Sequence, residues 1–319
     1  MSNEIKLSII VPYHNEGDST IFPLFNSINN QTNINFNNIE IIVSNNCDLP
    51  VAPRSLFDNS FPNIQRRIRY TASSEIKNVC GASRQHGIKL SHGDYLIFCD
   101  DDDYLPSDDI LSYLINMSTK NPGIDVFRCR EYIQRQDLLV NEVFDNSNVL
   151  VHGKLFSARF VNNNKISFSD TLDVAEDNYF CNHFFAYNPK IIDCDKITYF
   201  FNYNSNSVSR KHKNFSLACQ KNSCIGIVNM MNKIMLDKNA PHEYAFRYLL
   251  TKLCQLENEL VPNLALYSIA NIVFKYDPTF KWIEGKYTTA NGYDITNRVI
   301  STTKKALLTV SKESNNHND

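Results

Sequence analysis

The sequence predicts an α/β fold in which a mostly parallel central sheet is flanked by helices and followed by a helical C-terminal appendage. Short apolar segments rich in β-branched residues alternate with helical segments in the first part of the chain, at the spacing of strand–helix–strand units. Several of these segments end abruptly in polar or acidic residues, as strands do at the edge of a sheet. Past about residue 213, apolar residues recur at a helical period instead.

The expected elements follow from these patterns. The run at 7–12 is β-branched and ends in proline, which indicates a first strand. A helix at about 18–30 and a strand at 39–43 complete a unit with a parallel strand pair. The remaining elements are a short strand at 67–70, helices at 81–90 and from 106 to about 117, strands at 95–99 and 124–132, helices at 152–160 and 173–185, and an aromatic strand at 197–203.

One strand organises the rest. The segment Tyr95–Cys99 is apolar throughout, as expected of a buried parallel strand, and it stops in four carboxylates, Asp100 to Asp103. Such close like charges raise one another's pKa unless a cation lies among them. Hard divalent cations accept carboxylate and phosphate oxygens, and ligands of open α/β sheets bind at the carboxyl ends of strands. The cluster therefore indicates a cation held against a phosphate; the plainer alternative is a solvated acidic turn that caps the next helix.

Two other kinds of metal site are disfavoured. An EF-hand would need a glycine and a distal glutamate that the segment after Asp100 and Asp102 lacks. The nine cysteines are odd in number, scattered, and never form a Cys-x-x-Cys pair. We interpret them as reduced core residues rather than zinc ligands.

Composition excludes several classes of protein. A hydrophobic content of 43% and a charged content of 21% are ordinary for a soluble globular protein. The net charge of -2 gives no reason to expect nucleic acid as a partner. No segment has the pattern of a signal peptide or a membrane-spanning helix, so we expect a cytoplasmic location.

Five segments resemble, in order, the motifs of family 2 inverting glycosyltransferases with the GT-A fold: SIIVPYHNE (8–16), EIIVSNN (40–46), ASRQHGI (82–88), GDYLIFCDDDD (93–103) and ED (176–177). The resemblance covers about residues 5–212. It implies a GT-A catalytic domain at 1–213, with a nucleotide-sugar half at about 1–105 and an acceptor half at about 106–213. A helical region at 214–311 and a disordered tail at 312–319 would follow.

The resemblance implies a nucleotide subsite made of Pro12, Tyr13, Glu16, Asn45, Arg84, Asp100 and Asp101. In it the Tyr13 ring offers a stacking face, Glu16 accepts from the ribose, and Arg84 faces the nucleotide. Tyr13 could equally pack on the sheet, and Arg84 could be a surface helix charge. Asn45 stands where the family commonly has an aspartate that reads the uracil N3 hydrogen. Its amide could accept that bond or donate to a different base, so the base stays open.

The resemblance also implies a cofactor and a catalytic base. Asp100 and Asp102 match an Asp-x-Asp pattern that holds Mn²⁺ or Mg²⁺, with Asp103 as a further carboxylate, and the cation stabilises the leaving nucleotide. Asp177 matches the base that removes a proton from the acceptor hydroxyl, and Glu176 orients the acceptor. Alternatively, these last two acids could simply favour a helix N-terminus electrostatically.

Two regions after residue 200 carry further expectations. Ser207, Ser209, Arg210 and His212 resemble a loop that closes over the diphosphate, although a solvated linker has the same composition. The helices past residue 213 are expected to serve the acceptor side or self-association into a homo-oligomer. Arg210–Lys213, with Lys304 and Lys305, could favour an anionic membrane face and hence peripheral membrane association.

The sequence therefore predicts a metal-dependent inverting glycosyltransferase of the hexosyltransferase class. It would move a sugar from a nucleotide-sugar donor, a UDP-sugar, to a hydroxyl of a glycan or lipid-linked acceptor in surface polysaccharide synthesis. A sugar-nucleotide pyrophosphorylase is an alternative, but it would need a glycine-rich loop that residues 12–17 lack. A non-catalytic carbohydrate-binding or assembly protein is a further alternative, which the intact acids disfavour. The sequence does not identify the sugar or the acceptor.

Overall fold

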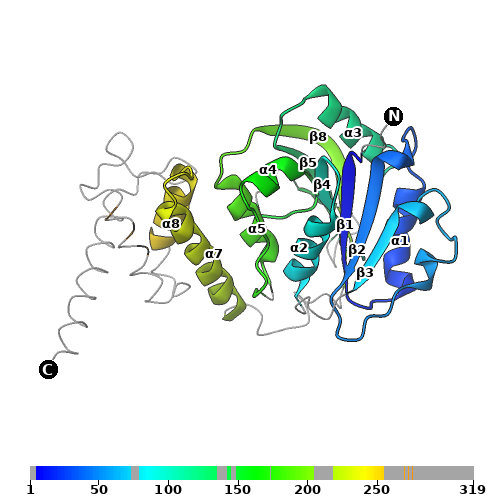
Figure 1. The fold of residues 1–319 in the computed structure, drawn as a ribbon, viewed down its shortest axis with the longest axis horizontal. Coiled ribbons are helices and arrows are strands. Elements are labelled where there is room, and N and C mark those ends of the chain that lie inside the picture. Colours follow the sequence, from blue (N-terminus) through cyan, green and yellow to red (C-terminus); the bar gives the residue numbers. More distant parts are fainter. Residues whose placement is uncertain are drawn as a thin grey trace. The chain divides into compact units, whose positions relative to one another are not determined.

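The computed structural model describes residues 5–72, 79–134, 142–144, 149–172, 174–204 and 218–254, together with residues 269, 272 and 275. The chain divides into two compact units (Figure 1). The first comprises Met1–Phe184 and Pro189–Lys211, and the second comprises Phe185–Asn188 and His212–Asp319. The predicted domain limits, including the tail at 312–319, are not tested by this division and stay predictions.

The first unit is built on one sheet of eight strands in the described part of the chain, ordered β3-β2-β1-β4-β7-β5-β6, with β8 also paired to β5. The strands β3, β2, β1 and β4 run parallel, as do β5 and β8, whereas β7 is antiparallel to both of its neighbours. The predicted α/β fold with a mostly parallel sheet is confirmed. The strand bounds are β1 (Leu7–Tyr13), β2 (Ile39–Asn45), β3 (Ile68–Ala72), β4 (Tyr95–Phe98), β5 (Val126–Ile133), β6 (Glu142–Phe144), β7 (Lys154–Ser157) and β8 (Ile191–Phe201).

Helices cover both faces of this sheet. Ile9 and Val11 of β1 belong to a core cluster with Phe25 and Leu114 of two helices on one face, α1 and α3. On the other face α2 packs against β1, and the aromatic ring of Phe98 contacts rings from β7 and α5. The helices of this unit are α1 (Asp18–Asn29), α2 (Cys80–Leu90), α3 (Ile110–Lys120), α4 (Ala158–Asn163) and α5 (Glu176–Phe185), with 3-10 turns at Phe36–Asn38, Arg54–Leu56 and Gln65–Arg67.

The strand register brings the expected polar ends together. Tyr13, the last residue of β1, pairs with Asn45, the last residue of β2, and Asn45 pairs in turn with Ala72. β4 pairs with β1 on the other side and leads directly into the acidic segment from Asp100. Three polar strand ends thus open on one edge, the place where open α/β sheets bind their ligands.

The prediction of a helix at 152–160 was wrong in its first half. Residues Lys154–Ser157 form β7, which lies between β4 and β5, and only Ala158–Asn163 is helical. All four β7 side chains are buried, so pairing with two distant strands overrides the local helical pattern. The last strand, predicted from residue 197, begins at Ile191 because it follows β5 through a bulge.

The second unit contains the helices α7 (Ala218–Leu236) and α8 (Glu243–Cys254), which pack against each other. The helical composition that the sequence indicates past residue 213 is therefore confirmed over these two ranges. No helix in the described part of the chain is both long and apolar enough to cross a membrane.

Candidate active site

A buried arginine joins two of the predicted motifs. Arg84 lies on α2 with only 2% of its side chain exposed. Its Nη2 donates to Asp100 Oδ1 at 2.6 Å, and its Nη1 donates to Glu176 Oε1 at 2.6 Å and Asp177 Oδ1 at 2.9 Å. We call Asp100, Glu176 and Asp177 the inner acids. The reading of Arg84 as a surface helix charge is wrong, because the side chain is buried among three carboxylates.

Close backbone approach places this arginine. A Cβ atom added to Gly81, in the first turn of α2, would lie 2.6 Å from the Ser169 carbonyl and 3.0 Å from Glu176 Cβ. Only glycine therefore lets α2 lie against the segment that begins α5. The Arg84 guanidinium also stands over the Phe168 ring, 5.8 Å from its centroid, and its Nε has no hydrogen-bond partner among the residues that the structure describes.

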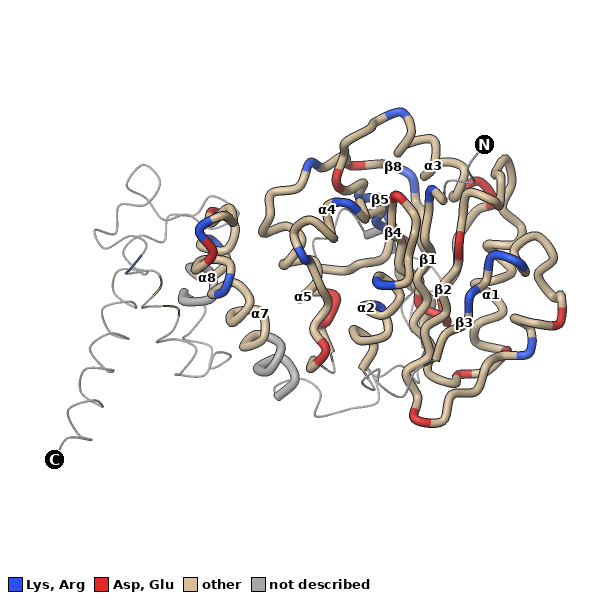
Figure 2. Tube along the Cα trace, in the orientation of Figure 1, with Lys and Arg blue, Asp and Glu red and all other residues tan. Residues whose placement is uncertain are grey.

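Asp177 has the setting of a proton acceptor. Burial raises its pKa, whereas Arg84 opposes that rise and the Val151 N–H donates to the carboxylate. Burial and the neighbouring Asp177 raise the pKa of Glu176 too, again against Arg84. Both acids stand in the first turn of α5, which Figure 2 marks as acidic, so the helix N-terminus also favours their charge. A carboxylate whose pKa is moved toward neutrality is suited to general-base work.

A second group of carboxylates lies at the same edge of the sheet. We call Glu16, Asp101 and Asp102 the outer acids. Burial raises the pKa of Asp101 well above its usual range, and Glu16 raises it further through charge and a side-chain hydrogen bond. Burial also raises the pKa of Asp102, against a 2.7 Å hydrogen bond from Asn204. No ion pair reaches these three acids from the described part of the chain.

Asp103 plays a different part from the metal ligand that the sequence suggested. Its side chain is 1% exposed, its Oδ1 accepts from the Asn202 N–H at 2.8 Å, and its Oδ2 accepts from the Tyr199 hydroxyl. The same hydroxyl accepts from the Asp100 N–H at 2.9 Å. Asp103 therefore ties the end of β8 to the acidic segment, and its oxygens face the protein interior.

The residues predicted to bind the nucleotide lie at the expected edge of the sheet. The side chains of two of them, Tyr13 and Asn45, already form hydrogen bonds with other residues of the protein. Tyr13 is only 3% exposed, which favours the core-packing reading of its ring, and its hydroxyl accepts from the Gly17 N–H at 2.9 Å. The Asn45 amide donates to Asn15 at 2.7 Å and to the Tyr70 hydroxyl at 2.9 Å. Both of its N–H groups are thus used, and its oxygen already accepts one bond, from the Cys47 N–H.

Two other nucleotide-side residues complete this edge. Pro12 is buried within β1. Glu16 is exposed in the following loop and accepts from the His14 N–H at 2.6 Å, so its carboxylate can still reach a ligand. The loop residues Ser207, Ser209, Arg210 and His212 lie outside the described residues, so their expected contact with the diphosphate stays a prediction.

The side chains that could hold the divalent cation implied by the family resemblance are the outer acids and Asp100. The Asp101 Oδ2 atom is buried and has no hydrogen-bond partner in the described part of the chain, and the nearby acids offer the oxygen ligands that hard cations prefer. Among the described residues, however, no three His, Cys, Asp or Glu side chains are arranged as a complete metal site. The protein would thus supply one or two carboxylates, and substrate phosphates and water the remaining ligands.

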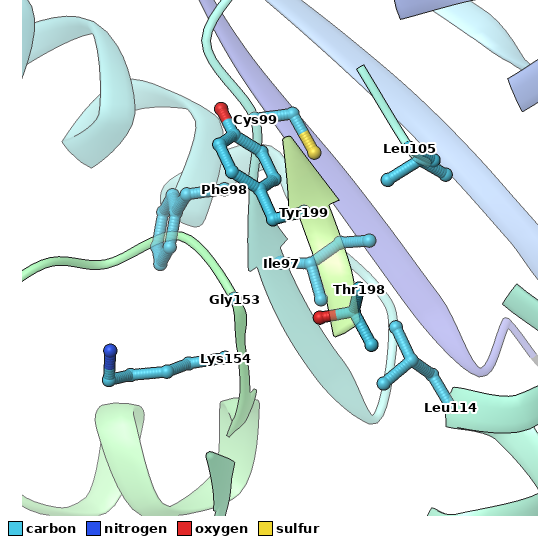
Figure 3. A pocket seen from close by; sticks show the side chains of 9 residues that line it. All are labelled: Ile97, Phe98, Cys99, Leu105, Leu114, Gly153, Lys154, Thr198 and Tyr199. Atoms are coloured by element: carbon cyan, nitrogen blue, oxygen red, sulfur yellow. The ribbon is translucent and has the colours of Figure 1, made fainter. Parts of the chain in front are cut away.

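The sequence did not single out a buried polar layer behind the inner acids. It comprises His152, Glu131 and Lys154, all with exposure of 4% or less, and Tyr199. His152 and Lys154 were hidden in the segment misread as a helix, and no local signal links them to Glu131. A cavity of about 20 Å³ lies nearby, lined by apolar side chains with Lys154, Thr198 and Tyr199 (Figure 3). It has room for roughly one water molecule, so this cavity is too small for a nucleotide sugar.

Comparison with known proteins gives an independent assignment. The family model described as "Glycosyl transferase family 2" matches residues 8–168, half of the 319-residue chain. A poly(ribitol-phosphate) beta-glucosyltransferase of Bacillus spizizenii is 28% identical over 189 residues. That alignment covers 55% of this chain and 29% of the relative, so the chain spans less than a third of that protein's length.

Solved structures agree at the level of the fold. The crystal structure of S. aureus TarS 1-349 in complex with UDP-GlcNAc has a TM-score of 0.65 and 16% identity, covering 98% of this chain and 92% of that one. The complex of the same protein with UDP has a TM-score of 0.60 and 15% identity over the same shares of the two chains. At such low identity this likeness speaks for the fold alone.

Proposed function

Since this chain belongs to glycosyl transferase family 2 and is a glycosyltransferase, we propose that it transfers a sugar from a UDP-sugar, with inversion, to a hydroxyl of a glycan or lipid-linked acceptor of the bacterial surface. Family membership decides against the sugar-nucleotide pyrophosphorylase and the non-catalytic binding protein considered from the sequence. The donor is proposed because a relative of the same fold is solved with UDP-GlcNAc, and the acceptor because a relative acts on poly(ribitol phosphate).

The observation that carries the proposal is the arrangement around Arg84. This side chain connects Asp100, at the end of the strand that leads into the acidic segment, with Asp177, at the start of α5. A transferase needs both a site for the anionic diphosphate and a base for the incoming hydroxyl, held at a fixed separation. A single buried guanidinium with hydrogen bonds to both sides provides that fixed geometry.

Asp177 then acts on the acceptor. A sugar hydroxyl is a weak nucleophile, and a carboxylate that accepts its proton as the new bond forms accelerates the attack. Attack from the face opposite the departing diphosphate inverts the anomeric centre. Glu176, beside the base and held by the same guanidinium, is placed to orient the acceptor or to keep Arg84 aligned.

The outer acids serve the donor. Three carboxylates without a cationic partner among the described residues repel an anionic diphosphate, so binding requires positive charge from elsewhere. Mn²⁺ or Mg²⁺, held by Asp102 and Asp100, would neutralise the diphosphate and stabilise the leaving nucleotide. Glu16 remains available at the rim for a ribose hydroxyl, as its exposed position allows.

A screen of nucleotide sugars tests this proposal. The full chain is incubated with UDP-, GDP- and dTDP-sugars and a ribitol-phosphate or glycan acceptor, with Mn²⁺ or with EDTA, and nucleoside diphosphate release is measured. We expect release from a UDP-sugar that depends on the metal. Absence of release and of thermal stabilisation with every UDP-sugar, against a response to another donor, would contradict the choice of UDP.

A further inference from the structure

The segment that precedes β7 wraps the first turns of α5. The Val151 N–H donates to the Asp177 carboxylate, and the Leu150 carbonyl accepts from Cys181 Sγ at 3.3 Å, one turn further along α5. The Lys154 Nζ donates to the same Leu150 carbonyl at 2.7 Å. The position of the proposed base therefore depends on how residues 150–154 are held.

His152 is the most constrained side chain of this segment. It is 3% exposed, and its Nδ1 is hydrogen-bonded to the carboxylate of Glu131, which is itself 3% exposed. Its ring stacks on Tyr199, with centroids 4.7 Å apart and planes within 10°, and Phe201 lies at 5.4 Å. Hydrogen bonding and stacking together fix the ring in one orientation.

A glycine makes this pairing possible. Gly153 has a φ of +66°, which is rarely adopted by residues with a side chain. A Cβ atom there would approach the Glu131 carboxylate and the Cys129 carbonyl to 3.4 Å each. The backbone turns sharply at Gly153, so His152 faces Glu131 while Lys154 continues into β7.

The charges around His152 come from every element packed against it. Glu131 lies on β5, Lys154 on β7, Tyr199 on β8, Asp177 on α5, and Asp100 and Asp103 follow β4. Burial lowers the pKa of His152, but Glu131, Asp177 and Asp100 outweigh it and raise the pKa above its ordinary value. The neighbouring carboxylates thus favour the imidazolium form, and its charge acts in turn to lower the pKa of Asp177.

We propose that His152 is a positioning residue for the transfer reaction, held as an imidazolium by Glu131 so that its charge and its backbone segment keep Asp177 ionised and in place. The inference rests on the proposed role of Asp177 as the base. His152 touches neither substrate nor donor in this role. Arg84 supplies one positive charge against the three negative charges of the inner acids, and the His152 imidazolium supplies a second positive charge nearby.

A second histidine, which is half-buried, provides a control. His183 also lies on α5, but the Ser167 N–H donates to its Nδ1 at 3.2 Å, and burial lowers its pKa to about 4. This imidazole is neutral at assay pH, so it exerts no comparable field on Asp177. Replacing it removes a half-buried ring of the same size without removing a charge.

The first test measures the coupling without any turnover. Histidine side chains of the full chain are labelled with ¹⁵N, and the His152 signal is assigned by its absence in His152→Gln. We expect His152 to titrate above an ordinary histidine in the parent and at lower pH in Asp177→Asn and in Glu131→Gln, because coupling between two sites is reciprocal. An unchanged titration of His152 in Asp177→Asn would overturn the proposal, whether or not a transferred sugar has been found.

The second test uses the pH profile of transfer, once a donor is in hand. We expect His152→Gln and Glu131→Gln to move the acidic limb of kcat/KM to higher pH and to lower transfer on the order of tenfold at the acidic end, as second-layer substitutions do. His183→Gln should leave the limb in place. A His152→Gln profile lowered equally at all pH values would reduce His152 to a structural residue. Failure of all donors with the parent would instead refute the proposed function, while the titration still decides the coupling.

Discussion

The inner and outer acids lie at the same edge of the sheet but differ in whether a cationic side chain is paired with them. The inner acids share the buried guanidinium of Arg84 through three hydrogen bonds of 2.6 to 2.9 Å. The outer acids have no such partner among the described residues, and burial raises the pKa of both Asp101 and Asp102. The inner acids thus have a cationic partner within the described part of the protein, and the outer acids do not.

This difference suits the two tasks proposed for the two groups of acids. A base must keep a fixed position and charge before substrate arrives, which internal compensation by Arg84 provides. A site for an anionic donor binds it better if the carboxylates of the site have no cationic partner within the protein. Such carboxylates can bind a metal cation that the donor also binds. The cost is a less stable fold at this edge, as expected where function requires uncompensated charge.

The largest expected effect is the loss of the proposed base, Asp177. Asp177→Asn keeps the size of the side chain and an oxygen for Arg84 but cannot accept a proton. Transfer should fall by about 10²–10⁴-fold, the usual worth of general-base catalysis, while UDP affinity and melting temperature stay close to those of the parent. Steady-state kinetics with the acceptor, beside calorimetry with UDP, provide the measurement. Near-parental turnover would move the base elsewhere, with Glu176 the next residue to replace.

Removal of the Arg84 guanidinium, which the three inner acids share, should lower the stability of the fold most. Arg84→Met removes a buried cation from three half-buried carboxylates and should cost about 3 kcal/mol of unfolding free energy at pH 7.5, measured by denaturant titration. Arg128→Met is the matched control, because its partner Asp193 is half-exposed and such pairs are worth about 1 kcal/mol or less.

The pH dependence of this loss has a defined sign. Although burial opposes it, Arg84 lowers the pKa of Asp100 below its usual range, so this pairing stabilises the fold above the unfolded pKa and is lost as the pH falls through the folded one. The unfolded pKa of an aspartate is about 4, so the Arg84→Met deficit should hold from pH 7.5 to about pH 4 and shrink as the pH falls further. A deficit that stays constant below pH 4 as well would show that packing, not charge, is what Arg84 contributes.

Replacing one of the outer acids should change stability in the opposite direction, and by less. The pKa of Asp101 is raised in the folded state, so its carboxyl stabilises the fold below its unfolded pKa and loses that contribution as pH rises through the folded pKa. Asp101→Asn should therefore stabilise the protein by about 1 kcal/mol at pH 7.5, and by less at pH 4. Thermal melts measure this, with the exposed Asp48→Asn as a neutral control. A lower melting temperature for Asp101→Asn would contradict the conclusion that the ionised Asp101 carboxylate destabilises the fold.

Much of this edge could be predicted from the sequence because its signals are local. The β1, β2 and β4 strands are apolar runs ended by proline or polar residues, and the acidic motifs follow them directly. The burial of Arg84 could not be predicted, since two of its partners lie 92 and 93 residues further along the chain. His152 and Glu131 were missed for the same reason: β7 forms only by pairing with two strands distant in sequence.

Calorimetry of UDP binding tests the distinction between inner and outer acids most directly. UDP is titrated into the parent, Asp102→Ala and Asp177→Asn, each with Mn²⁺ and with EDTA. We predict that the parent and Asp177→Asn bind UDP more tightly with Mn²⁺, whereas Asp102→Ala loses roughly 10–100-fold of that affinity and becomes insensitive to the metal. Equal metal dependence in Asp102→Ala and the parent, or an equal loss in both variants, would contradict the assignment of the donor to the outer acids.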